Sequence, residues 1–263
     1  MIYGFKLVTA ILFSGAMAVC SLGQSVYVCG ANSVGVIGNN LEVKEICNIE
    51  RLSPDHWIIG LVDVANRICF VTRNSQGVSY YDVFTMEQMT VREVMSAAPT
   101  EWFLVSENKK TLIKSNVSRY APIEVEPDAC FSTEEVTVVI DNSNEATYLC
   151  GQDGTVRQVK LPTKVFATAC YNGKLLCTRT SGGVWLYDIG TQKIEKWKFS
   201  QRGDIPLLVT SENKLIVSRC HGWFREIYET LMVDMQTGVA SKICDGRVRF
   251  ACEEANPGSG FRF

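Results

Sequence analysis

The sequence of 263 residues lacks the features that mark several large classes of protein. Its lysines and arginines form no dense run and the formal net charge is only −2, which argues against a protein that binds nucleic acid through bulk charge. It contains no G-x-S-x-G and no P-loop, so a nucleophile elbow and a Walker-type phosphate site are excluded. Almost no stretch has the 3.6-residue periodicity of an amphipathic helix, which disfavours an α-rich fold.

Metal ligands are also scarce, because the chain has only two histidines, His56 and His221, and no C-x-x-C. We therefore predict no metal site and no cofactor. Ten of the eleven cysteines follow residue 23, an even number that would allow disulfides in an oxidising compartment. Most of them lie in apolar, strand-like segments such as ICFV and LLCT, which favours buried free thiols.

The N-terminus has the layout of a secretory signal. No charge occurs between Lys6 and Glu42, and Leu7–Cys20 is an apolar run followed by small residues. We expect residues 1–23 to be a signal peptide or apolar leader; the alternatives are an uncleaved membrane anchor or a buried first element of the domain. A signal would place the protein in the secretory pathway or outside the cell, with Asn116 of the sequon Asn-Val-Ser as a glycosylation site. Without a signal the protein would be cytoplasmic or nuclear.

Short runs rich in Val, Ile, Tyr, Phe and Thr dominate from residue 26 to 250, separated by turn residues. Asn172-Gly173 lies between two such runs and predicts a tight hairpin with a type I′ turn. The segment Phe84–Met95 is ambiguous, and we interpret it as a turn followed by a strand. The run that begins Trp57-Ile-Ile-Gly is interpreted as core.

The chain repeats itself. Residues 69–85 (CFVTRNSQGVSYYDVFT) align without a gap, at an offset of 106, with residues 175–191 (LLCTRTSGGVWLYDIGT), and eight of the 17 positions are identical. Downstream, WFLVSENKKTLIKS parallels PLLVTSENKLIVS. An offset of 106 is consistent with two units of about 50 residues.

Five segments share a strand-end pattern, apolar residues followed by Cys-Gly or Asp: Tyr27–Gly30, Tyr80–Val83, Tyr148–Gly151, Leu186–Ile189 and Leu231–Met235. A small sheet can bury its faces only against neighbours in a ring. We therefore predict an all-β fold, a complete or incomplete β-propeller of about five recognisable blades over residues 24–252, with a C-terminal tail over residues 253–263. A β-sandwich or a single barrel would not produce the internal repeat.

The stretch VYVCGANSVGVIG resembles the repeat of the RCC1-like family, the regulators of chromosome condensation, in which an aromatic strand is followed by Gly-x-Asn-x-x-Gly-x-x-Gly. The matching residues are Gly30, Asn32, Gly35 and Gly38, and the resemblance implies that they occupy tight turns of a propeller blade. Later units such as GVWLYDIGT look like blades of the WD type, which is the second candidate family. No exchange-factor residue can be matched.

Three aspartates recur at equivalent strand ends: Asp82, Asp188 and Asp234. They could form a ring of catalytic or metal-binding carboxylates. Because they repeat with the blades, and because a carboxylate in Asp-x-x-Thr accepts backbone N–H groups, we expect them to be structural.

The candidate contact residues for a partner are His221, Trp223, Phe224 and Arg225, which interrupt the repeat with the composition of a binding hot spot. Arg73 and Arg179, which repeat on hairpins expected to be adjacent, are further candidates, with a scaffold role as the alternative. We expect a non-enzymatic platform for protein–protein interaction, without nucleic acid, and with a membrane only through an uncleaved N-terminus. The alternative is a secreted or luminal propeller that binds or hydrolyses a glycan or peptide, which would require converging carboxylates.

Overall fold

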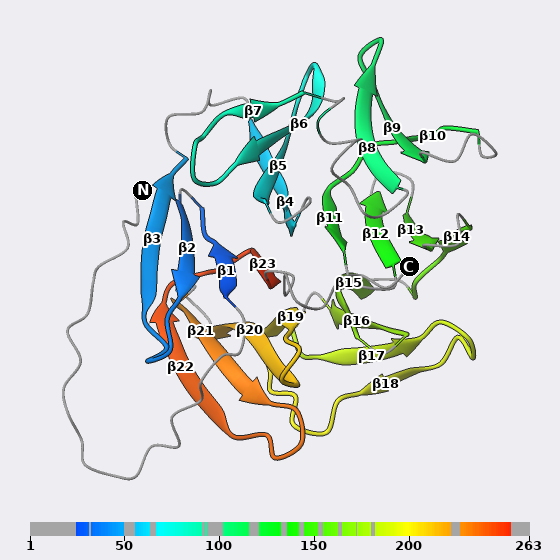
Figure 1. The fold of residues 1–263 in the computed structure, drawn as a ribbon. Coiled ribbons are helices and arrows are strands. Elements are labelled where there is room, and N and C mark those ends of the chain that lie inside the picture. Colours follow the sequence, from blue (N-terminus) through cyan, green and yellow to red (C-terminus); the bar gives the residue numbers. More distant parts are fainter. Residues whose placement is uncertain are drawn as a thin grey trace.

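The computed structural model describes residues 25–31, 33–49, 56–63, 67–90, 93, 102–115, 121–132, 136–141, 145–151, 155–162, 165–171, 173–179, 182–221 and 227–253. In these ranges the chain forms six antiparallel sheets arranged around a common centre, as the blades of a propeller (Figure 1). The predicted all-β propeller is confirmed. In the described part of the chain, no helix is both long and apolar enough to cross a bilayer.

The blades follow one another in chain order. Blade 1 contains β1 (Val26–Cys29), β2 (Ser33–Ile37), β3 (Val43–Asn48) and β23 (Phe250–Glu253); blade 2 contains β4 (Trp57–Asp63), β5 (Ile68–Asn74), β6 (Gly77–Asp82) and β7 (Gln88–Met89). Blade 3 contains β8 (Trp102–Glu107), β9 (Lys110–Ser115) and β10 (Ile123–Val125); blade 4 contains β11 (Ala129–Ser132), β12 (Val136–Asp141), β13 (Ala146–Gly151) and β14 (Val156–Val159). Blade 5 contains β15 (Val165–Tyr171), β16 (Lys174–Arg179), β17 (Trp185–Asp188) and β18 (Ile194–Lys196); blade 6 contains β19 (Asp204–Val209), β20 (Lys214–His221), β21 (Ile227–Asp234) and β22 (Ala240–Asp245).

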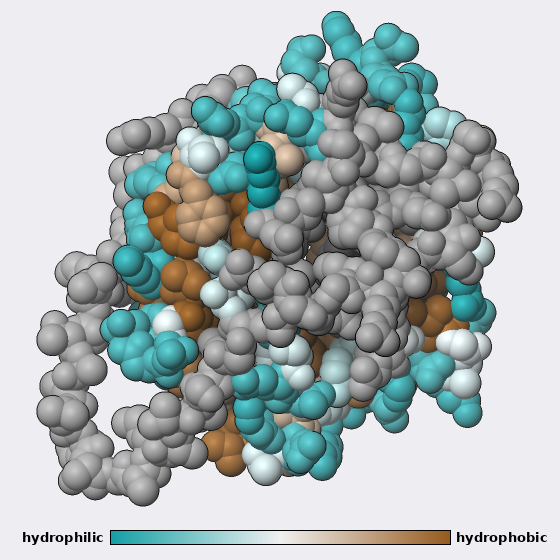
Figure 2. Space-filling view, in the orientation of Figure 1, coloured by the Kyte–Doolittle hydropathy of each residue, from teal (hydrophilic) through white to brown (hydrophobic). Residues whose placement is uncertain are grey.

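The hydrophobic core lies between the blades, in clusters that each join neighbouring sheets. Blades 1 and 2 share the cluster around Phe70, blades 5 and 6 the cluster around Leu215, and blades 6 and 1 the cluster around Ile216. In Figure 2 hydrophilic residues cover much of the visible outer surface, and hydrophobic residues show further in, between the hydrophilic patches. Each sheet therefore depends on its neighbours for burial, which is the physical reason for the repeat.

The two ends of the chain close the ring. β23 pairs antiparallel with β1, with Ala251 opposite Val28 and Cys252 opposite Tyr27. Blade 1 therefore combines the C-terminal strand with the first three strands, and its core cluster contains residues from both ends of the described chain.

The described residues form six blades, where about five could be recognised in the sequence. The five recognised strand ends lie in blades 1, 2, 4, 5 and 6, and blade 3 carries no such pattern. The repeat of 106 residues links blade 2 to blade 5, so it spans three blades of about 35 residues rather than two of about 50. Short strands and tight hairpins allow this shorter unit. Arg73 and Arg179 are therefore not on adjacent hairpins.

Blade 3 packs outside the innermost strands. β4 of blade 2 contacts β11 of blade 4 directly, and a Cβ on Gly60 would lie 2.5 Å from the carbonyl oxygen of Cys130. β8 of blade 3 packs instead on β6, where the Tyr80 hydroxyl accepts the N–H of Leu104 at 3.1 Å. Within the described residues, the strands nearest the centre are thus β4, β11, β15, β19 and β23 (Figure 1).

The hairpin predicted at Asn172-Gly173 connects β15 and β16, with Tyr171 opposite Lys174. Gly173 has a φ of 68°, as a type I′ turn requires, and Asn172 lies outside the described residues. In the segment predicted as turn plus strand, residues 83–85 form a turn and β7 follows it.

Candidate functional site

Antiparallel strands place alternate connections at opposite ends of the ring. The second strands of blades 2, 5 and 6 end at Arg73, Arg179 and Arg219 or within two residues of them, and we call this end the arginine face. The third strands of the same blades end with Asp82, Asp188 and Asp234, and we call that opposite end the turn face. The structure therefore separates the two sets of residues that the sequence singles out.

On the turn face, each of the three aspartates organises a turn. Asp82 Oδ1 accepts the N–H of Thr85 at 3.1 Å, Asp188 Oδ1 that of Thr191 at 2.7 Å, and Asp234 Oδ1 that of Thr237 at 2.8 Å. Backbone hydrogen bonds lower the pKa of Asp188, and a hydrogen bond from Lys214 is the main cause of a lowered pKa at Asp234. Carboxylates held in this way are engaged with the backbone of their own turns.

The glycines of the opening motif occupy different places in blade 1. The N–H of Gly30 donates to the carbonyl of Ser33 in the β1–β2 hairpin, and the carbonyl of Gly38 accepts the N–H of Leu41 in the next turn. Gly35, expected in a turn, lies inside β2 at a register shift, where a Cβ would be 2.6 Å from Val43. Asn32 lies outside the described residues.

The arginine face contains three arginines in equivalent positions, each preceded by Ser or Thr, and each has a different kind of partner. Arg73 Nη1 donates to the carbonyl of Pro127 at 3.1 Å and lies 3.9 Å from Asp128 Oδ1, and Arg73 Nη2 lies 3.8 Å from Glu126 Oε2. These acidic residues belong to the segment that enters β11. Arg73 therefore links blade 2 to blade 4.

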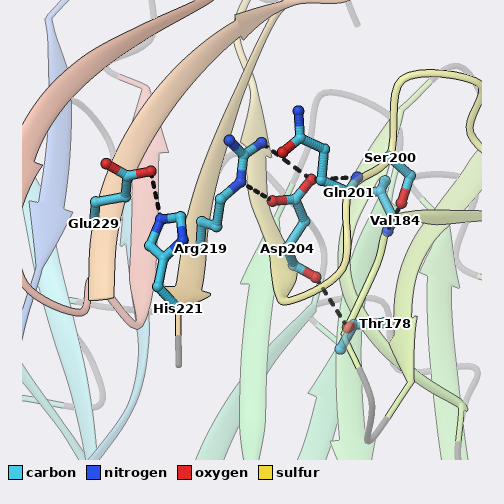
Figure 3. Close-up of polar contacts among 8 residues, drawn as sticks. All are labelled: Thr178, Val184, Ser200, Gln201, Asp204, Arg219, His221 and Glu229. Carbon is cyan, nitrogen blue, oxygen red and sulfur yellow. Dashed lines mark hydrogen bonds and ion pairs between the residues drawn. The ribbon is translucent and has the colours of Figure 1, made fainter. Parts of the chain in front are cut away.

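Arg219, which sequence reasoning missed, forms an almost completely buried ion pair (Figure 3). Its Nε donates to Asp204 Oδ1 at 2.6 Å, and the side chains of Arg219 and Asp204 are 11% and 1% exposed. Asp204 Oδ2 also accepts the N–H of Gln201 at 2.8 Å, and the Asp204 carbonyl accepts the hydroxyl of Thr178 in blade 5 at 3.3 Å. The pair therefore joins blades 5 and 6. Its only sequence signal is the equivalence of Ser218-Arg219 with Thr178-Arg179.

Arg179 has an aromatic ring as its partner. Its guanidinium carbon lies 3.8 Å from the centre of the Trp185 ring, at the start of β17, in a cation–π contact. Arg179 is exposed. The Nε1–H of Trp185 is buried and has no hydrogen-bond acceptor.

His221, at the end of β20, points toward Glu229 on β21 (Figure 3). Its Nε2 lies 2.6 Å from Glu229 Oε1, and the imidazole is half exposed. The other residues of the predicted hot spot, Trp223, Phe224 and Arg225, lie outside the described residues, as does the sequon residue Asn116.

Of the five large hydrophobic residues that are exposed in the described part of the chain, three lie on the arginine face: Trp57, Phe166 and Ile227. Trp57 is 73% exposed at the first residue of β4, so the interpretation of this residue as core is wrong. Because apolar residues follow Trp57 without interruption, the sequence does not show that Trp57 is the exposed first residue of the strand. Ile227 is 60% exposed and pairs with His221 across the ladder.

Other chemistry is not assembled in the described part of the chain. No cluster of three or more His, Cys, Asp or Glu side chains there could hold a metal ion. The described cysteines include six buried free thiols, and burial raises the pKa of Cys29, Cys130 and Cys150 to about 12. A thiol with so high a pKa is protonated and inert at neutral pH.

Comparison with solved structures identifies the class of the protein: the chain is a β-propeller. It resembles a chain of the crystal structure of a nidogen/laminin complex at 12% identity and a TM-score of 0.51, over 88% of this chain and 98% of that one. It also resembles TolB from Acinetobacter baumannii at 10% identity and a TM-score of 0.53, over 88% of this chain and 67% of that one. No protein-family model and no curated protein matches, so neither the RCC1-like nor the WD-type family is established.

Proposed function

We propose that this propeller is a non-enzymatic platform of the RCC1-like or WD-like type that binds a protein partner on its arginine face. The observation that carries the proposal is Trp57, a large aromatic side chain left 73% exposed at the start of an innermost strand. Trp is the residue most enriched at the centres of protein interfaces, because it buries a large area with little loss of conformational freedom.

Other exposed residues of the arginine face are consistent with a protein partner. Ile227 and Phe166 add exposed apolar surface on the same face, and Arg179 and His221 add polar groups at the ends of neighbouring second strands. Exposed apolar side chains accompanied by polar groups are the usual composition of an interface. The chain of similar fold in the nidogen/laminin complex belongs to a protein assembly, which supports protein binding as a use of this fold.

The arrangement of the carboxylates supports a role without catalysis. Asp204 is paired with Arg219, and Glu229 is paired with His221. The three turn-face aspartates accept hydrogen bonds within their own turns. Acid–base hydrolysis of a glycan needs two carboxylates facing one substrate in different environments.

Site-directed photo-crosslinking tests the proposal. A photoreactive phenylalanine analogue is placed at Trp57 or Ile227 on the arginine face, and at Phe84 or Val239 as controls, since these exposed residues follow third strands on the turn face. In the native cells, the same protein should be crosslinked from positions 57 and 227 and not from 84 and 239. Equal crosslinking from both faces, or none from either, would contradict the proposal.

A further inference from the structure

The three equivalent arginines of the arginine face differ in one respect that bears on the partner. Arg73 lies beside two carboxylates of blade 4, and Arg219 is paired with Asp204. Among the described residues, no carboxylate pairs with Arg179, which is exposed and stacks on Trp185 instead. Within the described residues, the arginines of blades 2 and 6 therefore have a counter-charge from the chain itself, and the arginine of blade 5 has none.

Stacking prepares Arg179 for an anion. A guanidinium placed over the face of an indole can still direct the N–H donors at the outer edge of its fork toward an anion. The ring also restricts the side chain, so less conformational entropy is lost when the donors are engaged. A carboxylate matches this fork with two parallel hydrogen bonds.

The rest of the site is consistent with a ligand at this place. Two glycines, Gly182 and Gly183, precede Trp185, and both have positive φ angles, 76° and 98°. The indole N–H beside Gly183 has no acceptor, which leaves a second polar group unsatisfied next to the guanidinium. An unsatisfied buried donor destabilises the unliganded state.

We infer that Arg179, held by Trp185, binds a carboxylate side chain of an acidic segment in the protein partner. The inference rests on the proposed function and names the chemistry of the partner at one point of the face. In the complex, the partner's carboxylate supplies the counter-charge that Asp204 gives to Arg219 and that Glu126 and Asp128 give to Arg73. Trp185 is a positioning residue, because it acts through the guanidinium.

The test uses the full chain and defined probes. The protein is titrated into a fluorescent octapeptide of alternating Glu and Gly, and binding is followed by the fluorescence anisotropy of the peptide. The matched Gln-Gly peptide and a phosphoserine-Gly peptide are tested in the same way, and inorganic phosphate is tested as a competitor. We expect saturable binding of the Glu peptide and none of the Gln peptide. Arg179→Lys should weaken binding at least about tenfold, because an ammonium cannot form the bidentate pair.

Variants separate a binding role from a structural one. Arg73→Ala removes the equivalent arginine that already has carboxylates, and binding should be unchanged. Trp185→Phe keeps a ring under Arg179 and should bind nearly as well as the original chain, whereas Trp185→Leu should bind as weakly as Arg179→Lys. Unchanged urea midpoints for these variants would show that the propeller remains folded.

Three results would overturn the inference: equal binding of the Glu and Gln peptides, binding of phosphate or the phosphoserine peptide in preference to the Glu peptide, or equal losses from Arg73→Ala and Arg179→Lys. Failure here is distinguishable from failure of the proposed function. If position 57 still crosslinks a partner that binds Arg179→Lys as tightly as the original chain, the platform remains and only the acidic contact is wrong.

Discussion

Asp204 and Arg219 differ from the other ion pairs of this protein because they are removed from water. Several of the other pairs in the described residues, such as Lys110–Glu124, have both side chains more than a third exposed. Exposed pairs contribute about 0–1 kcal/mol, because solvent screens the attraction and two long side chains lose freedom. Loss of one member of a buried pair leaves the other as an uncompensated buried charge, which lowers the free energy of unfolding much more.

We therefore predict that Asp204→Asn lowers the free energy of unfolding by about 3 kcal/mol, since it leaves the Arg219 guanidinium without its counter-charge. Glu124→Gln is the matched control and should lower it by less than about 1 kcal/mol. Urea denaturation followed by tryptophan fluorescence measures both. Similar losses from the two substitutions would mean that the Asp204–Arg219 pair is not effectively buried in solution.

The lowered carboxyl pKa values on the turn face make stability depend on pH. Asp188 and Asp234 have folded-state pKa values below their ordinary values, so both stay ionised in the folded protein to a lower pH than in the unfolded chain. Their contribution is present above the unfolded pKa of about 4 and is lost as the pH falls through the folded values.

We predict that Asp188→Asn combined with Asp234→Asn destabilises the protein at pH 6 and that the difference from the original chain shrinks steadily below pH 4. The reason is that protonation at low pH removes the two carboxylate charges from the original chain, and the substitutions have already removed the same charges from the variant. Urea midpoints at pH 6, 4 and 3 measure this. A difference that stays constant over this range would show that the two charges do not stabilise the turns.

At the scale of elements, one turn occurs three times. Each Asp-x-x-Thr turn is followed by a residue with positive φ, whose N–H donates to the carbonyl of the aspartate: Met86 (φ 61°), Gln192 (φ 57°) and Gly238 (φ 76°). Only the third turn has the residue that adopts this conformation without steric strain. The positive φ angles of Met86 and Gln192 therefore lower the stability of the folded protein.

We predict that Gln192→Gly raises the free energy of unfolding by up to about 1 kcal/mol, because relief of the positive φ exceeds the added freedom of the unfolded chain. Gln192 is exposed, so little packing is lost. Gly173→Ala is the converse control: its φ is 68° and no atom lies within 4 Å of the new Cβ, so it should destabilise by a similar amount. Thermal denaturation of both variants measures the two changes in stability. Destabilisation by Gln192→Gly would show that the positive φ of Gln192 is not strained.

These turns also explain what could be predicted from the sequence. Asp82, Asp188 and Asp234 act on residues two or three positions away, so their pattern is visible in a short stretch. The contacts of Arg73 with residues 126–128, and of Arg219 with Asp204, join positions that only the fold brings together. The repeat in the sequence predicts the hairpins, but it does not predict which distant residue each side chain contacts.

The same limit applies to the hairpins Ser106–Lys109 and Ser211–Lys214. Both contain Ser-Glu-Asn-Lys, and their asparagines, Asn108 and Asn213, have positive φ angles of 52° and 59°. Yet Ser106 lies beside Gly77 on the arginine face, whereas Ser211 donates to Glu253 at the turn-face end of β23. Local sequence determined the shape of the turn, and packing of the whole blade determined its place.

At the scale of the whole molecule, the ring depends on strands that are distant in sequence. Blade 3 contributes to a core shared with blades 2 and 4, while β4 and β11 meet directly at Gly60. Blade 1 depends on β23, whose last residue, Glu253, accepts hydrogen bonds from the N–H and hydroxyl of Ser211 in blade 6. β23 therefore connects three parts of the ring: blade 1, blade 6 and β4.

We predict that a chain ending at Val248, which lacks β23, loses a large part of the roughly 5–15 kcal/mol that stabilises a folded domain. β1 would become an open edge, and the cluster around Ile216 would lose Ala251. A chain ending at Ala255 is the control; it removes only residues from the expected tail and should unfold at the same urea concentration as the full chain.

A peptide of residues 247–255, added in trans, separates ring closure from general damage. If β23 acts by completing the sheet of blade 1, the peptide should bind the chain ending at Val248 and raise its urea midpoint, because its backbone can pair with β1. A peptide of the same composition in scrambled order should not, since Ala251 and Cys252 would no longer face the core. If the chain ending at Val248 matched the full chain in stability without any peptide, closure by β23 would not be what holds the propeller together.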